Sequence, residues 1–190
     1  MLLNLKRFVA SNQYFWRFRH IFNKNIFNYS YGKTPKNYFK KVFQNIKIES
    51  ILDYGCATGD KLNFFANNGT KFCYGIDINP QAIKTAKTKI NKLNVYSEFS
   101  HKISLININN YLKKKNLKKF DLVIIERLFY ILNNNNFYHA MEILAKKTKY
   151  IYIDDFFLNG KIHGNSLERL KISGYMHTNF DKILKKNKFK

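Results

Sequence analysis

The chain has 190 residues, a hydrophobic content of 45% and a formal net charge of +22 at pH 7. A chain of this length buries one sizeable core, so we expect one globular unit with a terminal extension. No stretch approaches the roughly 18 consecutive apolar residues of a membrane span, and residues 1–22 lack a signal-peptide cleavage site. The two cysteines form neither a disulfide framework nor a metal-ligand cluster, which favours a reducing, cytoplasmic location and no bound metal.

The positive charge alone favours a polyanionic partner, because each Lys or Arg that meets a phosphate adds salt-sensitive affinity. Nearly all the basic residues are Lys, however, and they accompany heavy use of Asn, Ile, Phe and Tyr. An AT-rich coding sequence produces this combined bias, so much of the charge reflects composition on solvated faces. We therefore rank nucleic acid below an anionic substrate or peripheral contact with an anionic membrane.

Residues 1–45 form the first segment, which is rich in aromatic and basic residues. Its apolar side chains between residues 15 and 26 fall near a helical stripe, which predicts one or two helices. A turn is expected at residues 31–35, followed by a helix from Lys36 to Gln44. We expect this N-terminal helical extension to pack against the main domain rather than to cap a substrate site.

From Ile48 onward, short apolar runs alternate with amphipathic segments, which is typical of a parallel sheet with helices on both faces. The expected strands are Ser50 to Tyr54, Phe72 to Asp77, Lys102 to Asn107, Phe120 to Glu126 and Tyr150 to Asp155. The expected helices are Lys61 to Asn67, Pro80 to Leu93, Asn110 to Asn116 and Phe137 to Lys147. The sequence thus predicts an α/β fold with a Rossmann-like, doubly wound and mostly parallel sheet, in a domain of residues 46–190.

The pattern weakens after the fifth strand. Three glycines break residues 156–176 into an expected loop, and a short helix is expected over residues 179–188. No room is left for further strands after that helix. We therefore expect strand five to be an open edge, covered by the loop or by a partner, and a homodimer through that edge is one such arrangement.

A glycine-containing segment follows the first expected strand, with the sequence Asp53-Tyr54-Gly55-Cys56-Ala57-Thr58-Gly59-Asp60. Gly55 and Gly59 allow tight turning and a close approach of the backbone to a ligand. The spacing differs from the Gly-x-Gly-x-x-Gly of a dinucleotide site, and a P-loop would end in Gly-Lys-Ser or Gly-Lys-Thr. Here Asp60 follows the last glycine, and its charge repels phosphate. NAD and ATP therefore rank low as ligands.

Asp77 ends the second expected strand, at the same edge of the sheet as the glycine loop. A carboxylate there can accept hydrogen bonds from both hydroxyls of a ribose, at about 1.5–3 kcal/mol each. Ile78 would then cover one face of an adenine. The alternative is that Asp77 caps the helix beginning near Pro80. With the glycine loop some twenty residues upstream, we favour the ribose.

These segments resemble a known family. Asp53 to Gly59, Gly75 to Pro80 and Phe120 to Glu126 are similar to motifs I, II and IV of class I S-adenosylmethionine-dependent methyltransferases. The resemblance covers about residues 48–156, and one departure is Ala57, where the family usually has a middle glycine. It implies S-adenosyl-L-methionine as the cofactor. It also implies a C-terminal antiparallel hairpin, which we expect to be truncated in this chain.

The resemblance further implies roles for individual residues. Asp53 and the glycine-loop backbone would meet the methionine moiety, Asp77 the ribose and Ile78 the adenine. Asn107 stands where the family often has an Asp that reads the adenine amino group, and Glu126 would lie beside the methionine and the acceptor. The cofactor-binding residues implied are Asp53, Gly55, Cys56, Ala57, Gly59, Asp77, Ile78, Asn107 and Glu126.

Methyl transfer requires mainly alignment in a dry pocket, and a general base becomes useful when the acceptor is a sugar hydroxyl. The candidate bases are Glu126, Asp154, Asp155, His163 and His177. We favour Glu126 and Asp154 as catalytic residues. We expect at least one of the two adjacent aspartates to form structural hydrogen bonds instead.

The residues after Glu126 are Arg127-Leu128-Phe129-Tyr130. Enzymes that methylate exocyclic amines of bases or Gln side chains typically have Asn-Pro-Pro-Tyr or a near relative there. The sequence therefore favours a small-molecule or carbohydrate acceptor, and its flanks bear a weaker resemblance to methyltransferases of bacterial surface-polysaccharide clusters. Two alternatives stay open: an RNA methyltransferase that uses the Lys-rich surface, and a non-catalytic adenosyl-binding or scaffold protein.

Overall fold

The computed structural model describes residues 34–101, 105–159 and 167–189, together with Phe15, Arg17 and Ile162. These residues fall into two compact units, one within Arg17–Ile103 and one made of Met1–Trp16 with Ser104–Lys190. Most of the predicted N-terminal extension lies outside the described residues. Its last helix, α3, is described and spans Thr34–Phe43, close to the expected range.

The unit within residues 17–103 carries three parallel strands, which are β1 (Ser50–Tyr54), β2 (Phe72–Ile76) and β3 (Tyr96–Ser100). Every residue of β1 is buried, as expected for a strand covered on both faces. Helix α4 (Asp60–Ala66) packs on β1 and β2, and α5 (Pro80–Ile90) packs on β3 and α4. The expected strands and helices 50–54, 72–77, 61–67 and 80–93 are confirmed to within a few residues.

The expected third strand, Lys102 to Asn107, is wrong. The strand is Tyr96–Ser100, and Leu105–Asn107 forms a single 3-10 turn, η3, before α6 (Ile108–Lys114). Strand β3 ends the sheet, and its side chains are only half-buried or exposed. It therefore lacks the apolar run that marks a buried strand, and the apolar residues downstream gave the stronger pattern.

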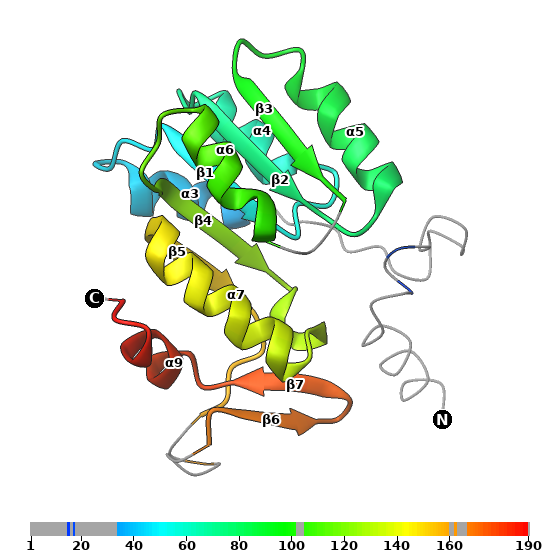
Figure 1. Ribbon diagram of the computed structural model, residues 1–190, viewed down its shortest axis with the longest axis vertical. Coiled ribbons are helices and arrows are strands. Elements are labelled where there is room, and N and C mark those ends of the chain that lie inside the picture. The colour runs from blue at the N-terminus through cyan, green and yellow to red at the C-terminus, as the bar shows by residue number, and fades with distance from the viewer. Residues whose placement is uncertain are drawn as a thin grey trace. The chain divides into compact units, whose positions relative to one another are not determined.

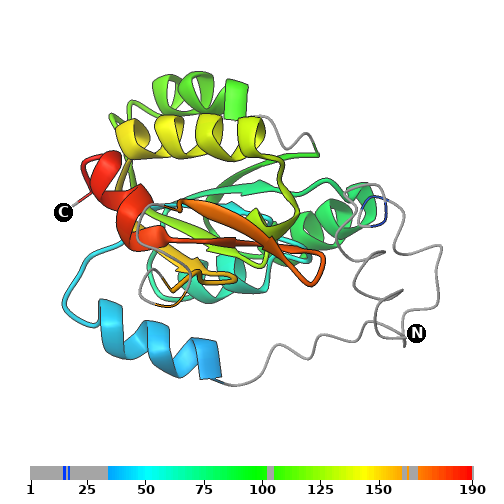
Figure 2. The same ribbon diagram turned by 90° about the horizontal axis from the view of Figure 1, so that it is seen from below.

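The other unit contains β4 (Phe120–Glu126), η4 (Phe129–Ile131), α7 (Asn134–Lys147) and β5 (Thr148–Asp154). Strands β4 and β5 are parallel, and α6 and α7 lie side by side in one layer over them (Figure 2). The side chain of Asn133 caps α7, which buries an apolar stripe. Taken together, the five strands follow the order β3-β2-β1-β4-β5, which confirms the predicted doubly wound α/β fold.

The chain after β5 does not form only the expected loop. Residues 169–178 form an antiparallel hairpin of β6 (Arg169–Ile172) and β7 (Tyr175–Thr178), followed by α9 (Phe180–Lys186) (Figure 1). Its turn, Ser173-Gly174, has φ angles of 50° and 90°, as a tight two-residue hairpin requires. The hairpin that we expected to be truncated is thus present, as a small sheet of its own.

The hairpin is joined to the segment that follows β5. The N–H of Leu158 donates to the carbonyl of Thr178 at 2.9 Å, and the N–H of Thr178 donates to the carbonyl of Phe156 at 2.9 Å. These bonds bring side chains from the end of β5 and from β7 together. In the described part of the chain, no helix is long and apolar enough to cross a membrane.

Candidate functional site

The glycine loop after β1 has three residues in the left-handed region. The φ angles are 93° at Gly55, 45° at Ala57 and 74° at Gly59. The N–H groups of Gly55 and Cys56 both donate to the carbonyl of Ile76, at 2.7 and 2.9 Å, and thereby tie the loop to the end of β2. Glycine adopts this conformation readily, whereas Ala57 pays a steric cost for its Cβ.

Asp77 holds the loop from the end of β2. Its Oδ2 accepts from the N–H of Ala57 at 2.8 Å, and its Oδ1 accepts from the N–H of Asn79 at 2.8 Å. The cap of α5 is Asn79, whose Oδ1 accepts from the N–H groups of Gln81 and Ala82. The alternative that Asp77 itself caps this helix is therefore wrong.

Asp53 is fully buried within β1, and a buried lysine lies near it. Lys61, in the first turn of α4, is 8% exposed, and its Nζ is 4.0 Å from Oδ2 of Asp53. Sequence reasoning missed Lys61. The available signal was its place in the first turn of a short helix whose neighbouring apolar residues face the core.

Cys56 lies in the glycine loop, near the carboxylates of Asp53 and Asp77. Burial raises the pKa of its thiol well above the ordinary value, and the charges of Asp53 and Asp77 raise it further. The thiol therefore stays protonated at neutral pH and is a poor nucleophile. The Cys56 side chain is buried and packs within the loop.

Two glycines permit close packing next to the loop. A Cβ on Gly59 would lie 2.8 Å from the Cβ of Ala86, on α5. A Cβ on Gly75, in β2, would lie 2.6 Å from the Phe99 ring and 3.0 Å from Sγ of Cys56. Neither position accepts a larger side chain without displacing its neighbours.

The chemistry of the glycine loop and of the end of β2 fits an adenosine-containing cofactor. Ala57, Thr58, Asp77 and Ile78 are all half-buried, so the loop and the end of β2 present one partly open edge. A carboxylate can accept about four hydrogen bonds, so the two backbone bonds of Asp77 do not exhaust its capacity. Asp60 is exposed and paired with Lys89 at 2.7 Å.

The other unit contains the remaining predicted residues. Glu126 and Asp154 end β4 and β5 and are register partners, so the two favoured bases lie side by side. Asn107 is exposed at the start of α6, where its side chain forms no capping hydrogen bond. It therefore belongs to a helix start rather than to the predicted strand end.

Asp155 has a structural role. Its Oδ2 accepts from the N–H groups of Leu128 and Phe129, at 3.0 and 2.6 Å, and its Oδ1 accepts from the N–H of Phe156 at 2.7 Å. Burial raises the pKa of this carboxyl, and the backbone bonds counteract that effect. The expectation that one of the two aspartates is structural is thus confirmed, and it is Asp155.

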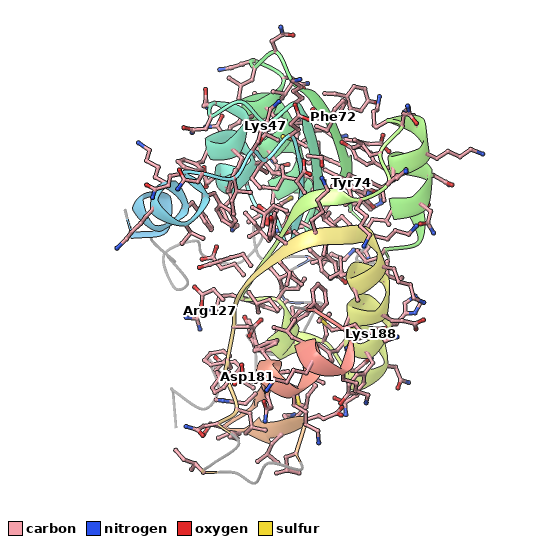
Figure 3. The ribbon with its side chains drawn as sticks, turned by 90° about the vertical axis from the view of Figure 1, so that its left-hand side faces the viewer. Lys47, Phe72, Tyr74, Arg127, Asp181 and Lys188 are labelled. Carbon is pink, nitrogen blue, oxygen red and sulfur yellow. The ribbon has the colours of Figure 1, made fainter. Side chains whose placement is uncertain are left out.

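Arg127 directly follows β4 with a φ of 51°, which is unusual for a residue with a side chain. Its N–H donates to the carbonyl of Asp154 at 2.9 Å, and its Nε is 3.7 Å from Oδ1 of Asp154. The guanidinium lies over the ring of Phe156, 5.0 Å from its centroid. Figure 3 shows this side chain directed away from the ribbon.

Phe156 is also part of an aromatic cluster with Tyr130 and Tyr175. The rings of Phe156 and Tyr175 are stacked, 4.9 Å apart at 6°, and Tyr130 meets both edge-on. His177 lies against Phe156 at 5.2 Å, with its Nδ1 3.4 Å from the carbonyl of Phe157. His163 lies outside the described residues. Sequence reasoning missed this cluster because it joins residues up to 45 positions apart.

Arg169 fastens the hairpin to the loop after β4. Its NH2 group donates to the carbonyls of Phe129 and Leu132, at 2.7 and 3.2 Å, and its Nε donates to Oγ1 of Thr178 at 3.1 Å. The guanidinium also lies 4.0 Å from the centroid of the Phe137 ring. Burial lowers its pKa to about 10, which leaves it charged at neutral pH.

The family model described as a methyltransferase domain matches residues 46–189. The comparison with curated proteins finds no match.

Solved structures with the same fold include three methyltransferases. The N-methyltransferase NodS from Bradyrhizobium japonicum WM9, in complex with S-adenosyl-L-homocysteine, is 17% identical over 72% of this chain and 68% of its own, with a TM-score of 0.53. The plantazolicin methyltransferase BpumL, also with S-adenosyl-L-homocysteine, is 23% identical over 90% of this chain and 66% of its own, with a TM-score of 0.52.

The small RNA methyltransferase HEN1 is 17% identical over 85% of this chain and 22% of its own, with a TM-score of 0.57. The chain therefore spans less than two thirds of the length of the last two neighbours. At these identities the likeness concerns the fold. Because the family match covers well over half of its residues, the chain belongs to the family of class I S-adenosylmethionine-dependent methyltransferase domains.

Proposed function

We propose that this chain transfers a methyl group from S-adenosyl-L-methionine to a small-molecule or carbohydrate acceptor. The observation that carries the proposal is the bond between Asp77 and the N–H of Ala57, which fixes a left-handed loop beside a half-buried carboxylate. A loop held in this way is preorganised, so cofactor binding loses no free energy in ordering it.

Each residue near the loop has a proposed task. Asp77 accepts hydrogen bonds from the ribose, Ile78 covers the adenine, and the backbone from Gly55 to Gly59 lies against the methionine portion. Lys61 offsets the charge of Asp53, so that a buried carboxylate is tolerated beside the loop. Asn107 and Glu126 complete the set of cofactor residues in our proposal.

When bound, S-adenosyl-L-methionine would supply a methyl group on a sulfonium sulfur, and that sulfur is a good leaving group because it departs as a neutral thioether. The protein's residues then have to orient the acceptor and accept its proton. Glu126 and Asp154 are the proposed bases, because they end adjacent strands and both are at least partly exposed. Asp154 is paired with Arg127 at 3.7 Å, so this guanidinium would help to orient that base.

Calorimetric titration with S-adenosyl-L-methionine tests the cofactor proposal. Since Asp77 also orders the loop, Asp77→Ala would remove a ligand contact and loop bonds together. A better pair is 5′-methylthioadenosine and its 2′-deoxy analogue, titrated into the wild type and Asp77→Asn. If Asp77 binds the ribose, the deoxy analogue binds the wild type at least tenfold more weakly, and the penalty shrinks in Asp77→Asn.

Four outcomes would count against the proposal. Absence of S-adenosyl-L-methionine binding by the folded wild type would reject a methyltransferase. An equal deoxy penalty in both proteins would reject the ribose role of Asp77. Methyl transfer from labelled cofactor to RNA alone would replace the small-molecule acceptor by the RNA alternative, and binding without transfer to any acceptor would favour a non-catalytic protein.

A further inference from the structure

We propose that Arg127, Phe156 and Tyr175, with Asp154, form the acceptor subsite, and that it takes an uncharged ring that carries hydroxyl groups. This inference rests on the proposed function and names the substrate class of that same site. All four residues belong to one compact unit.

The subsite is a stack beside the carboxyl ends of two parallel strands. The guanidinium of Arg127 lies over Phe156, and Phe156 is stacked on Tyr175 at an interplanar angle of 6°. Tyr130 is 5% exposed and packs edge-on against both rings. Phe156 and Tyr175 are only half-buried, so aromatic surface remains for a ligand. Ligands of open α/β sheets bind at this end of the strands.

The backbone conformation of Arg127 supports a functional role for this residue. A left-handed φ costs a residue with a side chain about 1 kcal/mol or more, and such strain persists where the surroundings enforce it. Here the bond from its N–H to Asp154 enforces it. The result is a guanidinium held against a ring while its side chain stays 52% exposed.

The segments that form the stack offer little positive charge to a polyanionic acceptor. The chain has 34 basic residues, 29 of them Lys, yet the segments 120–145, 150–160 and 172–181 contain no Lys. These segments supply every residue of the stack. Arg127 is balanced by Asp154, and Glu126 adds a further carboxylate. The stack therefore offers a phosphate chain a guanidinium that already has a carboxylate partner, in spite of the net charge of +22.

The choice of Arg over Lys also sets this place apart. Only five of the basic residues are Arg, and two of them, Arg127 and Arg169, lie on aromatic rings in this unit. A planar guanidinium stacks on a ring and keeps its N–H groups directed outward in a fixed fork, whereas an ammonium does neither. In a Lys-rich chain, the use of Arg at these two positions indicates that the planar shape of the side chain is required as well as its charge.

A ring with hydroxyl groups matches these parts. Its C–H face packs on an aromatic ring, its hydroxyls donate to the carboxylate of Asp154, and they accept from the guanidinium of Arg127. An opposed pair of charges on an aromatic surface thus suits a neutral ligand that both donates and accepts. A strongly charged ligand would satisfy only one member of the pair.

Saturation-transfer NMR on the full chain, with saturating S-adenosyl-L-homocysteine, tests this inference. The probes are the methyl α-D-glycopyranosides of glucose, galactose and mannose, with glucose 6-phosphate and an octauridylate as charged competitors. We expect a signal from at least one glycoside. It should fall at least fivefold in Arg127→Lys and Tyr175→Ala, and persist in Tyr175→Phe and in Lys146→Met, an exposed site on α7.

Calorimetry with S-adenosyl-L-homocysteine on every variant separates the two proposals. If the wild type binds it and no glycoside gives a signal, the acceptor inference is overturned and the proposed function stands. Loss of cofactor binding by the folded wild type overturns both. A glycoside signal that is as strong in Arg127→Lys and Tyr175→Ala as in the wild type also rejects the inference, and so does a variant-sensitive signal from octauridylate alone. Should Tyr175→Ala fail to fold, Arg127→Lys carries the test.

Discussion

The carboxylate of Asp77 accepts a 2.8 Å hydrogen bond from the N–H of Ala57, and Ala57 is held at a φ of 45°. The residue that replaces the family's usual glycine therefore still adopts the backbone conformation that glycine favours. One hydrogen bond across twenty residues joins the two parts of the sequence that carry the proposed cofactor site.

Ala57→Gly should stabilise the protein. Removing the Cβ relieves the left-handed strain, whereas the greater flexibility of glycine stabilises the unfolded state. We expect the first effect to be larger, with a net gain of about 0.5–1 kcal/mol in unfolding free energy. Chemical denaturation measures it. Ala82→Gly, in the helix α5, is the matched control and should lose about 1 kcal/mol. Two variants destabilised alike would contradict the strain at Ala57.

Gly59→Ala should be destabilising for two reasons that a double mutant separates. The new Cβ would lie 2.8 Å from that of Ala86, and φ is 74°. We expect a loss of about 2–3 kcal/mol from overpacking and backbone strain combined. In an Ala86→Gly background the 2.8 Å contact disappears and the nearest atom becomes the Cα of residue 86 at 3.2 Å, so the loss should shrink by about 1 kcal/mol. An unchanged loss would assign the whole effect to the backbone.

The motifs of the sequence were sufficient for most of the fold and for the position of the glycine loop at the end of β1. The strands of residues 50–54, 72–76 and 120–126 are buried and apolar, and the glycine loop is local in sequence, so both could be read from the chain. Strand β3 could not be, because an edge strand needs no apolar run. The hairpin β6–β7 could not be either, because its short strands are half-exposed.

The proposed acceptor subsite depends on contacts between distant residues. Asp154 and Asp155 look equivalent in the sequence, and only the path of the backbone at 128–130 and 156 decides which one is structural. The stacking of Phe156 on Tyr175 likewise follows from the bonds between Thr178 and the segment after β5. No local pattern encodes such pairings.

Asp154→Asn and Asp155→Asn should therefore behave differently. Asp155→Asn places an amide where the carboxylate accepts several backbone N–H groups, and we expect a loss of about 2–3 kcal/mol in unfolding free energy. Asp154→Asn disturbs only an exposed ion pair and should change stability by less than about 0.5 kcal/mol. Urea denaturation of both variants decides. Comparable losses would contradict the division of roles.

Arg169→Lys should loosen the hairpin despite keeping the charge. A lysine cannot reproduce the donors to Phe129, Leu132 and Thr178 or the contact with Phe137, so we expect a loss of about 2–3 kcal/mol. Amide hydrogen exchange at Leu158 and Thr178 should accelerate most, while amides of β1 and β2 keep their protection relative to global unfolding. Uniform acceleration across the chain would contradict a local fastening role.

Alkaline pH should destabilise the protein through its buried thiols. Burial, with a further contribution from the charge of Asp53, raises the pKa of Cys73 to about 12. In the unfolded chain a thiol has a pKa of about 8.5. Between these two values the unfolded state loses its proton while the folded state keeps it, so stability falls as pH rises through this range. The contribution is complete below a pH of about 8.5.

The size of the effect can be measured with Cys73→Ala. At pH 9.5 the unfolded thiol alone lowers stability by about 1.4 kcal/mol relative to neutral pH. The variant should be less stable than the wild type at pH 7, because it loses buried side-chain volume, yet its stability should fall less steeply above pH 8.5. The pKa of Cys56 is also raised, but Cys56 remains in both proteins. The difference between the two slopes therefore isolates the effect of Cys73. Guanidinium denaturation at pH 7, 8.5 and 9.5 gives both slopes, and parallel slopes would show that Cys73 titrates alike in the folded and unfolded chains.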